Sequence, residues 1–303
     1  MNSDTTDNKT PSVQDIEAAW KQFDNDLCIP GASAPSRGLI TMIMGKIGTW
    51  KTTTAALWPN PVFMSITKEG GEASLGQFPQ IWGMTPPPSY NIRNIDMFNL
   101  KMNFLVNNAA KMGFKTIVVD SLTMLVDMWV GELLVMRAAE LAYSRKKRIT
   151  EIEKFQAIME QSDWGRLENY ICRNVADRLH GTGLNVVYTV LLKEKTRTEV
   201  DGPRRGEARV TETVPDIQGA TARKIPSMCD LLLYAKKEQR IAQGGMKHAM
   251  VYYTETPPGD TMIELRHRFG PCFPEGRLVD PEYGDWIPTF RAIQQRIGPY
   301  IRL

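Results

Sequence analysis

The chain has 303 residues, of which 42% are hydrophobic and 23% are charged, a composition typical of globular proteins that bury a sizeable core. The formal net charge of +3 is too small to create a strongly basic surface field, so nucleic-acid binding would have to rest on local clusters of Lys and Arg. The 4 cysteines lie far apart without C-x-x-C spacing, which argues against a zinc site or a disulfide framework and favours reduced thiols.

Residues 1–36 are predicted to form a flexible N-terminal tail with one short helix at about residues 13–23, where apolar side chains recur at helical spacing. The polar start of the chain lacks the pattern of a signal peptide, and no apolar run reaches the length of roughly 18 residues that spans a membrane. We therefore expect a cytoplasmic protein without membrane contact. Residues 37–303 are predicted to form one domain.

Residues 39–53, LITMIMGKIGTWKTT, read as a buried strand that turns through glycines into the start of a helix. The loop amides and the positive helix end would attract phosphate. Lys51 would reach the β- and γ-phosphates of a nucleotide, and the Thr52 hydroxyl would ligate a magnesium ion that bridges them. The predicted nucleotide-binding residues are Gly45, Lys46, Ile47, Gly48, Thr49, Trp50, Lys51, Thr52 and Thr53.

The loop matches the pattern G-x-x-x-x-G-K-[ST] except at one position. Trp50 stands where the second glycine normally lets the backbone approach phosphate without a side chain in the way. An ordinary strand, turn and helix without a ligand is the alternative, and the motifs that follow favour a phosphate-binding loop.

Two carboxylates follow the next core strands. Glu69 comes after the strand at residues 62–66 and before two glycines, and it is our candidate general base, which would orient the water that attacks the γ-phosphate; a solvated loop glutamate is the alternative. Asp120 ends the apolar run TIVVD, and its carboxylate would hold the magnesium-bound water. A helix-capping aspartate is the alternative there.

A helical segment is predicted at about residues 122–180, where no proline interrupts the pattern. It contains a basic run that could contact DNA phosphates by displacing their counterions, although a solvated helix face is the alternative. The run consists of Arg145, Lys146, Lys147 and Arg148.

Residues 184–192 read as another core strand, in which the Thr189 hydroxyl either senses the γ-phosphate or packs inside the sheet. Residues 193–213 contain few large apolar side chains and charges of both signs, so a mobile loop is predicted with a basic tip at Arg204 and Arg205. A solvated loop without a ligand is the alternative.

The last third of the chain is predicted to form a short helix at residues 220–228, strands at 230–235, 249–254 and 262–266, and a closing amphipathic helix at 286–301. The fold class is therefore α/β, with a mostly parallel central sheet, antiparallel C-terminal strands and flanking helices.

The order of these motifs resembles the RecA-like ATPase core, and within it the phage-encoded single-strand-annealing ATPases that consist of little more than that core. Four segments carry the resemblance over roughly residues 36–297: GKIGTWKTT with ALWPNPVF after it, TKEGG, TIVVDS, and VPDIQGATARKIPSMCDLLLYA. The step DWG at residues 163–165 is also similar. The form VVDS favours RecA-like proteins over the partitioning ATPases, to which Gly45-Lys46 is similar.

The resemblance implies an ATP- and Mg-dependent ATPase in which Lys51 and Glu69 are catalytic and Thr52 and Asp120 bind the metal. It implies that the loops after residues 120 and 192 contact single-stranded DNA, which adds Lys193 and Lys195 to the basic candidates. It further implies a homo-oligomer, either a ring or a filament, with a single-strand-binding protein as another candidate partner. A phage-encoded protein of this kind would act in the host cytoplasm.

The expected function is recombination by annealing or pairing of single strands. Two rivals stay open. One is an ATP-binding scaffold or regulator in which Trp50 has reduced turnover, and the other is a phage DNA motor or helicase-loading ATPase. DNA-stimulated turnover and salt-sensitive binding to single strands would separate the first function from both rivals.

Overall fold

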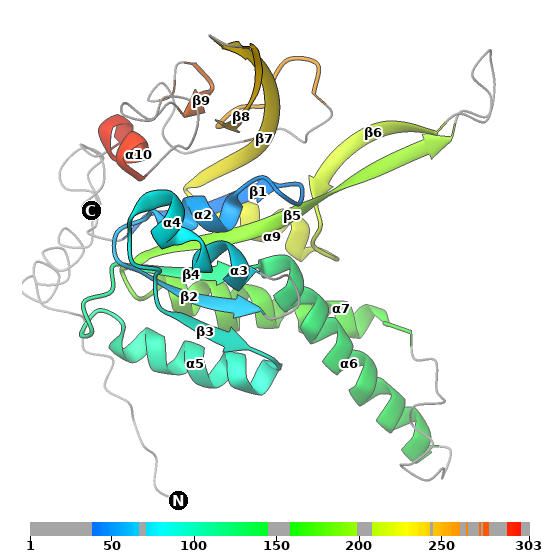
Figure 1. Ribbon diagram of the computed structural model, residues 1–303. Helices are drawn as coiled ribbons and strands as arrows, with labels where there is room; N and C mark the ends of the chain where they lie inside the picture. The colour runs from blue at the N-terminus through cyan, green and yellow to red at the C-terminus, as the bar shows by residue number, and fades with distance from the viewer. Residues whose placement is uncertain are drawn as a thin grey trace, which may run out of the picture. The chain divides into compact units, whose positions relative to one another are not determined.

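The computed structural model describes residues 38–66, 71–144, 158–198, 208–242, 245–260, 265, 273, 275–278 and 290–297 (Figure 1). The chain divides into two units, Met1–Ser36 and Arg37–Leu303. All the described residues belong to the second unit, so the predicted N-terminal tail and its short helix lie outside them.

In the part of the chain that the structure describes, one sheet of nine strands has the order β3-β2-β4-β5-β1-β7-β8-β9, with β6 paired to β5. The pairs from β3 across to β7 are parallel, whereas β5 with β6, β7 with β8, and β8 with β9 are antiparallel. The predicted fold class is confirmed. The strands are β1 (Ile40–Gly45), β2 (Pro61–Ile66), β3 (Ser89–Ile92), β4 (Thr116–Asp120), β5 (Asn185–Thr198), β6 (Ala208–Pro215), β7 (Leu231–Ala242), β8 (Gly245–Tyr253) and β9 (Arg277–Leu278).

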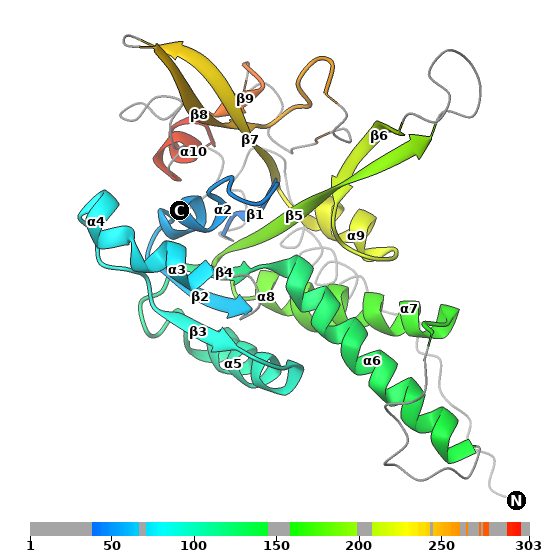
Figure 2. The ribbon, with the colours of Figure 1, turned by 45° about the vertical axis from the view of Figure 1, so that its right-hand side comes forward.

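Helices connect the parallel strands and cover both faces of the sheet (Figures 1 and 2). Their bounds are α2 (Lys51–Ala56), α3 (Gly71–Gly76), α4 (Phe78–Trp82), α5 (Ile95–Asn108), α6 (Leu122–Ser144), α7 (Gln161–Asn169), a π-helix (Tyr170–Asp177), α8 (Arg178–His180), α9 (Thr221–Met228) and α10 (Phe290–Ile297). Among the described helices, none combines the length and the apolar character that a membrane crossing requires.

The central strands are apolar along their whole length because both faces of a parallel sheet are covered. β1, β2 and β4 read ITMIMG, PVFMSI and TIVVD, and every residue in them is buried. Successive side chains point to opposite faces of the sheet, so each strand contributes side chains to two hydrophobic cores. Along β1, Ile40, Met42 and Met44 join one core, while Ile43 and the preceding Leu39 join the other.

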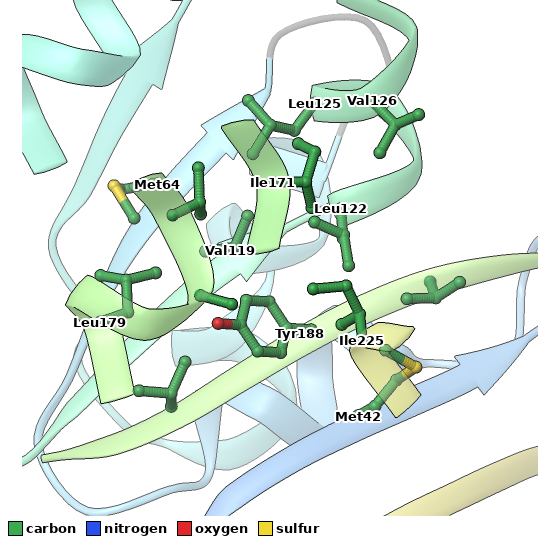
Figure 3. Packing of buried hydrophobic residues seen from close by; sticks show 14 of the residues in the cluster. Met42, Met64, Val119, Leu122, Leu125, Val126, Ile171, Leu179, Tyr188 and Ile225 are labelled. Carbon is green, nitrogen blue, oxygen red and sulfur yellow. The ribbon is translucent and has the colours of Figure 1, made fainter. Parts of the chain in front are cut away.

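The first core lies between the sheet and the helices α5, α6, α8 and the π-helix. In Figure 3, Val119 and Tyr188 of the sheet face Leu122 of α6 and Ile171 of the π-helix. The second core packs α2 and α10 on the opposite face. Burying one such side chain contributes about 1.5–3 kcal/mol, so the two cores fix the strands whose carboxyl ends carry the predicted site.

The prediction of a mobile loop at residues 193–213 is wrong over most of that range. β5 continues to Thr198 and β6 begins at Ala208, and the two strands form an antiparallel ribbon that extends away from the sheet (Figures 1 and 2). The ribbon consists mostly of charged and β-branched residues, and Lys195 lies opposite Glu212 with a salt bridge of 2.7 Å. Such cross-strand pairs stabilise a polar two-stranded ribbon. Residues 199–207 lie outside the described part.

Other elements differ in extent from the sequence-based expectation. The helical segment predicted at 122–180 contains α6, α7, the π-helix and α8, with α6 and α7 side by side (Figures 1 and 2). β7 runs to residue 242 and β8 begins at 245, so their hairpin is longer than expected. β3, α3 and α4 were not predicted. The described part of the closing helix is Phe290–Ile297, and most of the strand predicted at 262–266 lies outside the described residues.

Candidate functional site

The predicted phosphate loop connects the end of β1 to the start of α2. Gly45 has no room for a side chain, because an added Cβ would lie 2.3 Å from the Thr49 Oγ1 and 2.8 Å from the Ala235 carbonyl oxygen. Gly48 has a φ of 77°, a conformation that glycine adopts without steric cost. The Thr49 hydroxyl donates to the Lys46 carbonyl oxygen at 2.8 Å and closes the turn. The two glycines therefore shape the loop.

Trp50 has the left-handed conformation, with φ 54° and ψ 26°. For a residue with a Cβ this conformation costs about 1–2 kcal/mol, and the glycine of the common pattern avoids the cost. The residue is 46% exposed, and its carbonyl oxygen accepts the first helical hydrogen bond from the Thr54 amide at 2.9 Å. Trp50 therefore departs from the common sequence pattern without departing from its backbone shape, because it adopts the conformation that glycine would adopt there.

The Lys51 ammonium group lies inside the loop. It donates to the carbonyl oxygens of Gly45 at 3.0 Å and Lys46 at 2.9 Å, and the residue is buried. A cation held at this position is directed toward any anion that the loop encloses. The loop therefore places a positive charge at the predicted phosphate position.

Asp120 accepts hydrogen bonds from two hydroxyl groups. The Thr52 Oγ1 donates to the Asp120 Oδ2 at 2.9 Å, and the Thr189 Oγ1 donates to the other carboxylate oxygen. These contacts form because β5 lies between β1 and β4, so Thr189 stands beside the strand that ends at Asp120. Burial raises the pKa of Asp120, while the hydrogen bonds from Thr189 and Thr52 and the charge of Lys51 oppose that rise.

The oxygen atoms of Thr52 and Asp120 fit a magnesium ion. Mg²⁺ prefers hard oxygen ligands and is commonly held by one or two protein groups together with substrate phosphates. The two side chains meet 2.9 Å apart at the start of α2, next to the loop that encloses Lys51. A divalent cation would also offset the desolvation that raises the pKa of Asp120.

Of the remaining predicted loop residues, Lys46 and Ile47 lie at the surface. Lys46 forms an ion pair with Glu194 of β5, and Ile47 is 87% exposed. Thr53 lies in the first turn of α2 and is partly buried. A cleft of about 270 Å³ adjoins the loop on the side of β7, and its lining residues are Lys46, Ile47, Gly48, Thr49, Tyr234, Ala235, Lys236 and Lys237.

Several predicted residues lie outside the described part of the chain. These are Glu69, the basic run of Arg145, Lys146, Lys147 and Arg148, and the predicted basic pair Arg204 and Arg205. The structure does place Lys193 and Lys195 at the base of the ribbon. Lys193 pairs with Asp216 at 2.9 Å and Lys195 with Glu212 at 2.7 Å.

A second cleft, of about 530 Å³, lies at the base of the ribbon. It is lined by residues of β5 and β6 together with Gln218, Gly219 and two residues of α9, Ala222 and Arg223. Lys193 and Lys195 both contribute to it. The cleft therefore combines cations from the ribbon and from α9 with the carboxylate of Glu212, which also lines it.

Tyr252 was not among the residues that the sequence singled out. It lies on β8, fully buried, and its hydroxyl contacts the phosphate loop at the Thr49 and Trp50 carbonyl oxygens. No local motif marks it, because the contact joins strands from opposite ends of the domain sequence. Only the pairing of β7 with β1, and of β8 with β7, brings the tyrosine under the loop.

Comparison with known families adds an independent finding. A family model described as the AAA domain matches residues 37–261, which is well over half of the chain and includes the phosphate loop, Asp120, Thr189 and the ribbon. No curated protein matches the sequence. The chain belongs to the AAA domain family and is an AAA-type P-loop ATPase.

Proposed function

We propose that this P-loop ATPase binds ATP with magnesium, binds single-stranded DNA, and promotes annealing or pairing of strands in recombination. The observation that carries the nucleotide part is the meeting of Thr52 and Asp120 at 2.9 Å, beside a loop that encloses the Lys51 ammonium group. The annealing part rests on the resemblance of the four sequence segments to phage single-strand-annealing ATPases.

In this proposal Lys51 exchanges its contacts with the Gly45 and Lys46 carbonyl oxygens for phosphate oxygens. Thr52 and Asp120 would hold a magnesium ion, which would supply positive charge against the negative charge that develops during phosphoryl transfer. Thr189 holds one Asp120 oxygen by a hydrogen bond, so the other oxygen stays directed toward Thr52. Glu69 is the proposed general base, and it would orient the attacking water.

The DNA part of the proposal is supported by the path of β5. This strand carries Thr189 beside Asp120 and then continues into the ribbon, where Lys193 and Lys195 line a cleft together with Arg223. Both lysines have carboxylate partners, so DNA phosphates would compete with Asp216 and Glu212 for them. The basic residues 145–148, 204 and 205 are proposed as further phosphate contacts.

We further propose a ring or filament of identical chains with nucleotide near the subunit boundaries, acting in the host cytoplasm if the protein is phage-encoded. The exposed loop residue Ile47 and the exposed Trp50 support a partner surface beside the nucleotide site. A single-strand-binding protein is a further proposed partner.

A nucleotide-binding scaffold with slow turnover is the second candidate. The left-handed conformation of Trp50 favours it, because a strained loop with a bulky side chain would bind phosphate less closely than a glycine loop.

The deciding experiment measures ATP turnover with and without single-stranded DNA at fixed salt, for the wild type, Lys51→Ala and Trp50→Gly. Lys115→Ala is the matched control, because Lys115 is exposed and precedes the opposite end of β4. The recombination proposal expects DNA-stimulated turnover that Lys51→Ala abolishes and Lys115→Ala preserves.

The rival outcomes differ clearly. Turnover that appears only in Trp50→Gly would support the scaffold. Absence of both turnover and DNA binding in every variant would rule out the recombination proposal. DNA affinity should also fall steeply as salt rises, since phosphate contacts release counterions.

A further inference from the structure

The hydroxyl of Tyr252 contacts both peptide groups that flank the Trp50 backbone. It lies 3.2 Å from the Thr49 carbonyl oxygen and 3.3 Å from the Trp50 carbonyl oxygen. The Thr54 hydroxyl of α2 lies 2.5 Å away on the other side. Tyr252 is fully buried and Thr54 nearly so. One buried hydroxyl therefore touches the last two carbonyl groups of the phosphate loop and the first turn of its helix.

These contacts depend on the conformation of Trp50. A change of its φ from 54° to a negative value would rotate the peptide group between Thr49 and Trp50, and the Thr49 carbonyl oxygen would turn away from Tyr252. A residue held in a strained conformation keeps it only where surrounding contacts determine it. Tyr252 and Thr54 supply such contacts directly beside Trp50.

The Tyr252 hydroxyl can act as both a donor and an acceptor of hydrogen bonds in this network. Burial raises the pKa of Tyr252 well above that of a free tyrosine, so its hydroxyl keeps the proton and can donate it to a loop carbonyl oxygen. The Thr54 hydroxyl can in turn donate to the Tyr252 oxygen. A hydroxyl has one proton to donate and two lone pairs to accept, and this arrangement uses both properties.

The neighbouring strand β7 also contacts the phosphate loop. Ala235 of β7 pairs with Tyr252, and its carbonyl oxygen would lie 2.8 Å from a Cβ added to Gly45. The first glycine of the loop therefore lies against β7, and the last loop residues lie against Tyr252. The antiparallel strands at the C-terminal side of the sheet form the support on which the phosphate loop rests.

We propose that Tyr252 is a positioning residue for nucleotide binding. Its hydroxyl, together with Thr54, holds Trp50 in the left-handed conformation that starts α2 at Lys51 and keeps the loop closed around the lysine ammonium group. This inference rests on the proposed binding of ATP. In chains with glycine in place of Trp50 the same tyrosine would matter less, because glycine adopts a positive φ unaided.

The first test measures the equilibrium dissociation constant of a fluorescent ATP analogue in the presence of Mg²⁺. Tyr252→Phe removes only the hydroxyl and should weaken binding about 3- to 10-fold, which corresponds to the loss of one buried hydrogen bond. Tyr253→Phe is the matched control, because its hydroxyl bonds to Glu238 instead. Equal affinity of the wild type and Tyr252→Phe would overturn the proposal.

The second test repeats the change in the Trp50→Gly background. If Tyr252 acts through the conformation of residue 50, the loss of affinity should shrink to less than about twofold, since glycine removes the strain. A loss of the same size in both backgrounds would assign Tyr252 a general packing role and overturn the inference.

A third measurement does not depend on ATP. Amide hydrogen exchange of residues 46–51 should become faster in Tyr252→Phe, while exchange in α5 stays unchanged. A wild type that binds no ATP would refute the proposed function alone, and the exchange data would still decide the role of Tyr252. Unchanged exchange would refute the positioning role. If Tyr252→Phe does not fold, Thr54→Val removes the other hydroxyl and should have the same effects.

Discussion

The Thr52 hydroxyl donates a hydrogen bond to the Asp120 carboxylate at 2.9 Å across 68 positions of sequence. This contact joins the phosphate loop to the end of β4, and both oxygen atoms would bind a magnesium ion. When nucleotide and magnesium bind, each oxygen atom is therefore expected to exchange this hydrogen bond for a bond to the metal.

Asp120→Asn is expected to weaken the Mg²⁺-dependent part of ATP binding by at least about 10- to 100-fold, the range seen when groups around a bound metal are lost. Binding is measured by titration with ATP at several Mg²⁺ concentrations. Asp127→Asn is the control, because Asp127 is exposed on α6. An unchanged dependence on Mg²⁺ in Asp120→Asn would remove Asp120 from the metal site.

The stability of the metal-free protein should depend on pH through Asp120. Burial raises the pKa of Asp120 above its ordinary value of 3.8, so the folded state binds this proton more tightly than the unfolded state. Between the two pKa values the free energy of unfolding should therefore fall as pH rises, and the loss persists above the folded pKa. Urea unfolding at a series of pH values measures this contribution, which Asp120→Asn should abolish. A difference between the two proteins that is independent of pH would contradict the prediction.

Magnesium binding should have the opposite pH dependence. The metal binds the ionised carboxylate, so the stabilisation by Mg²⁺ and ATP should diminish as pH falls through the folded pKa of Asp120. The shift in melting temperature caused by Mg²⁺ and ATP, followed from neutral to acidic pH, provides the measurement. A shift that stays constant until the protein unfolds would argue against Asp120 as a ligand.

Trp50→Gly and Trp50→Ala should differ in stability although both remove the indole ring. Glycine relieves the left-handed strain, whereas alanine keeps a Cβ at a φ of 54°. The strain is worth about 1–2 kcal/mol, and the greater freedom of glycine in the unfolded chain offsets part of it. We expect Trp50→Gly to be the more stable variant by up to about 1 kcal/mol in urea unfolding. A more stable alanine variant would mean that residue 50 leaves the left-handed region in solution.

Two glycine substitutions should act in opposite directions. Gly45→Ala places a Cβ 2.3 Å from the Thr49 Oγ1 and 2.8 Å from the Ala235 carbonyl oxygen, so it should destabilise the fold by about 1–3 kcal/mol. Gly131→Ala meets no atom within 4 Å on α6 and should stabilise the helix by up to about 1 kcal/mol. Thermal unfolding of both variants measures the contrast, and a tolerated Gly45→Ala would show that β7 does not hold the loop.

The central strands could be predicted from sequence because a strand buried on both faces is apolar at every position. β1, β2 and β4 are of this kind, and the polar residues that follow them stood out for the same reason. Lys51, Thr52 and Asp120 could therefore be singled out as candidate site residues from the sequence alone.

The ribbon and Tyr252 could not be predicted for the converse reason. Both faces of the ribbon carry polar residues, so no hydrophobic alternation reveals strands there, and their pairing depends on partners such as Lys195 and Glu212. Tyr252 resembles any other core aromatic in a strand. Its contact with Thr54 spans 198 positions of sequence, and this contact can be inferred only once the order of strands in the sheet is known.

β5 has a geometric consequence for the evolution of the protein. The strand is continuous from the core into the ribbon, and its side chains change face with every residue. Insertion of one residue after Thr189 would turn every following side chain of β5 to the other face of the ribbon. Insertion of two would keep the faces and displace the described end of β5 by about 6–7 Å. Length changes in this strand should therefore be tolerated in pairs, unless the irregular register between Lys195 and Thr196 takes up a single residue.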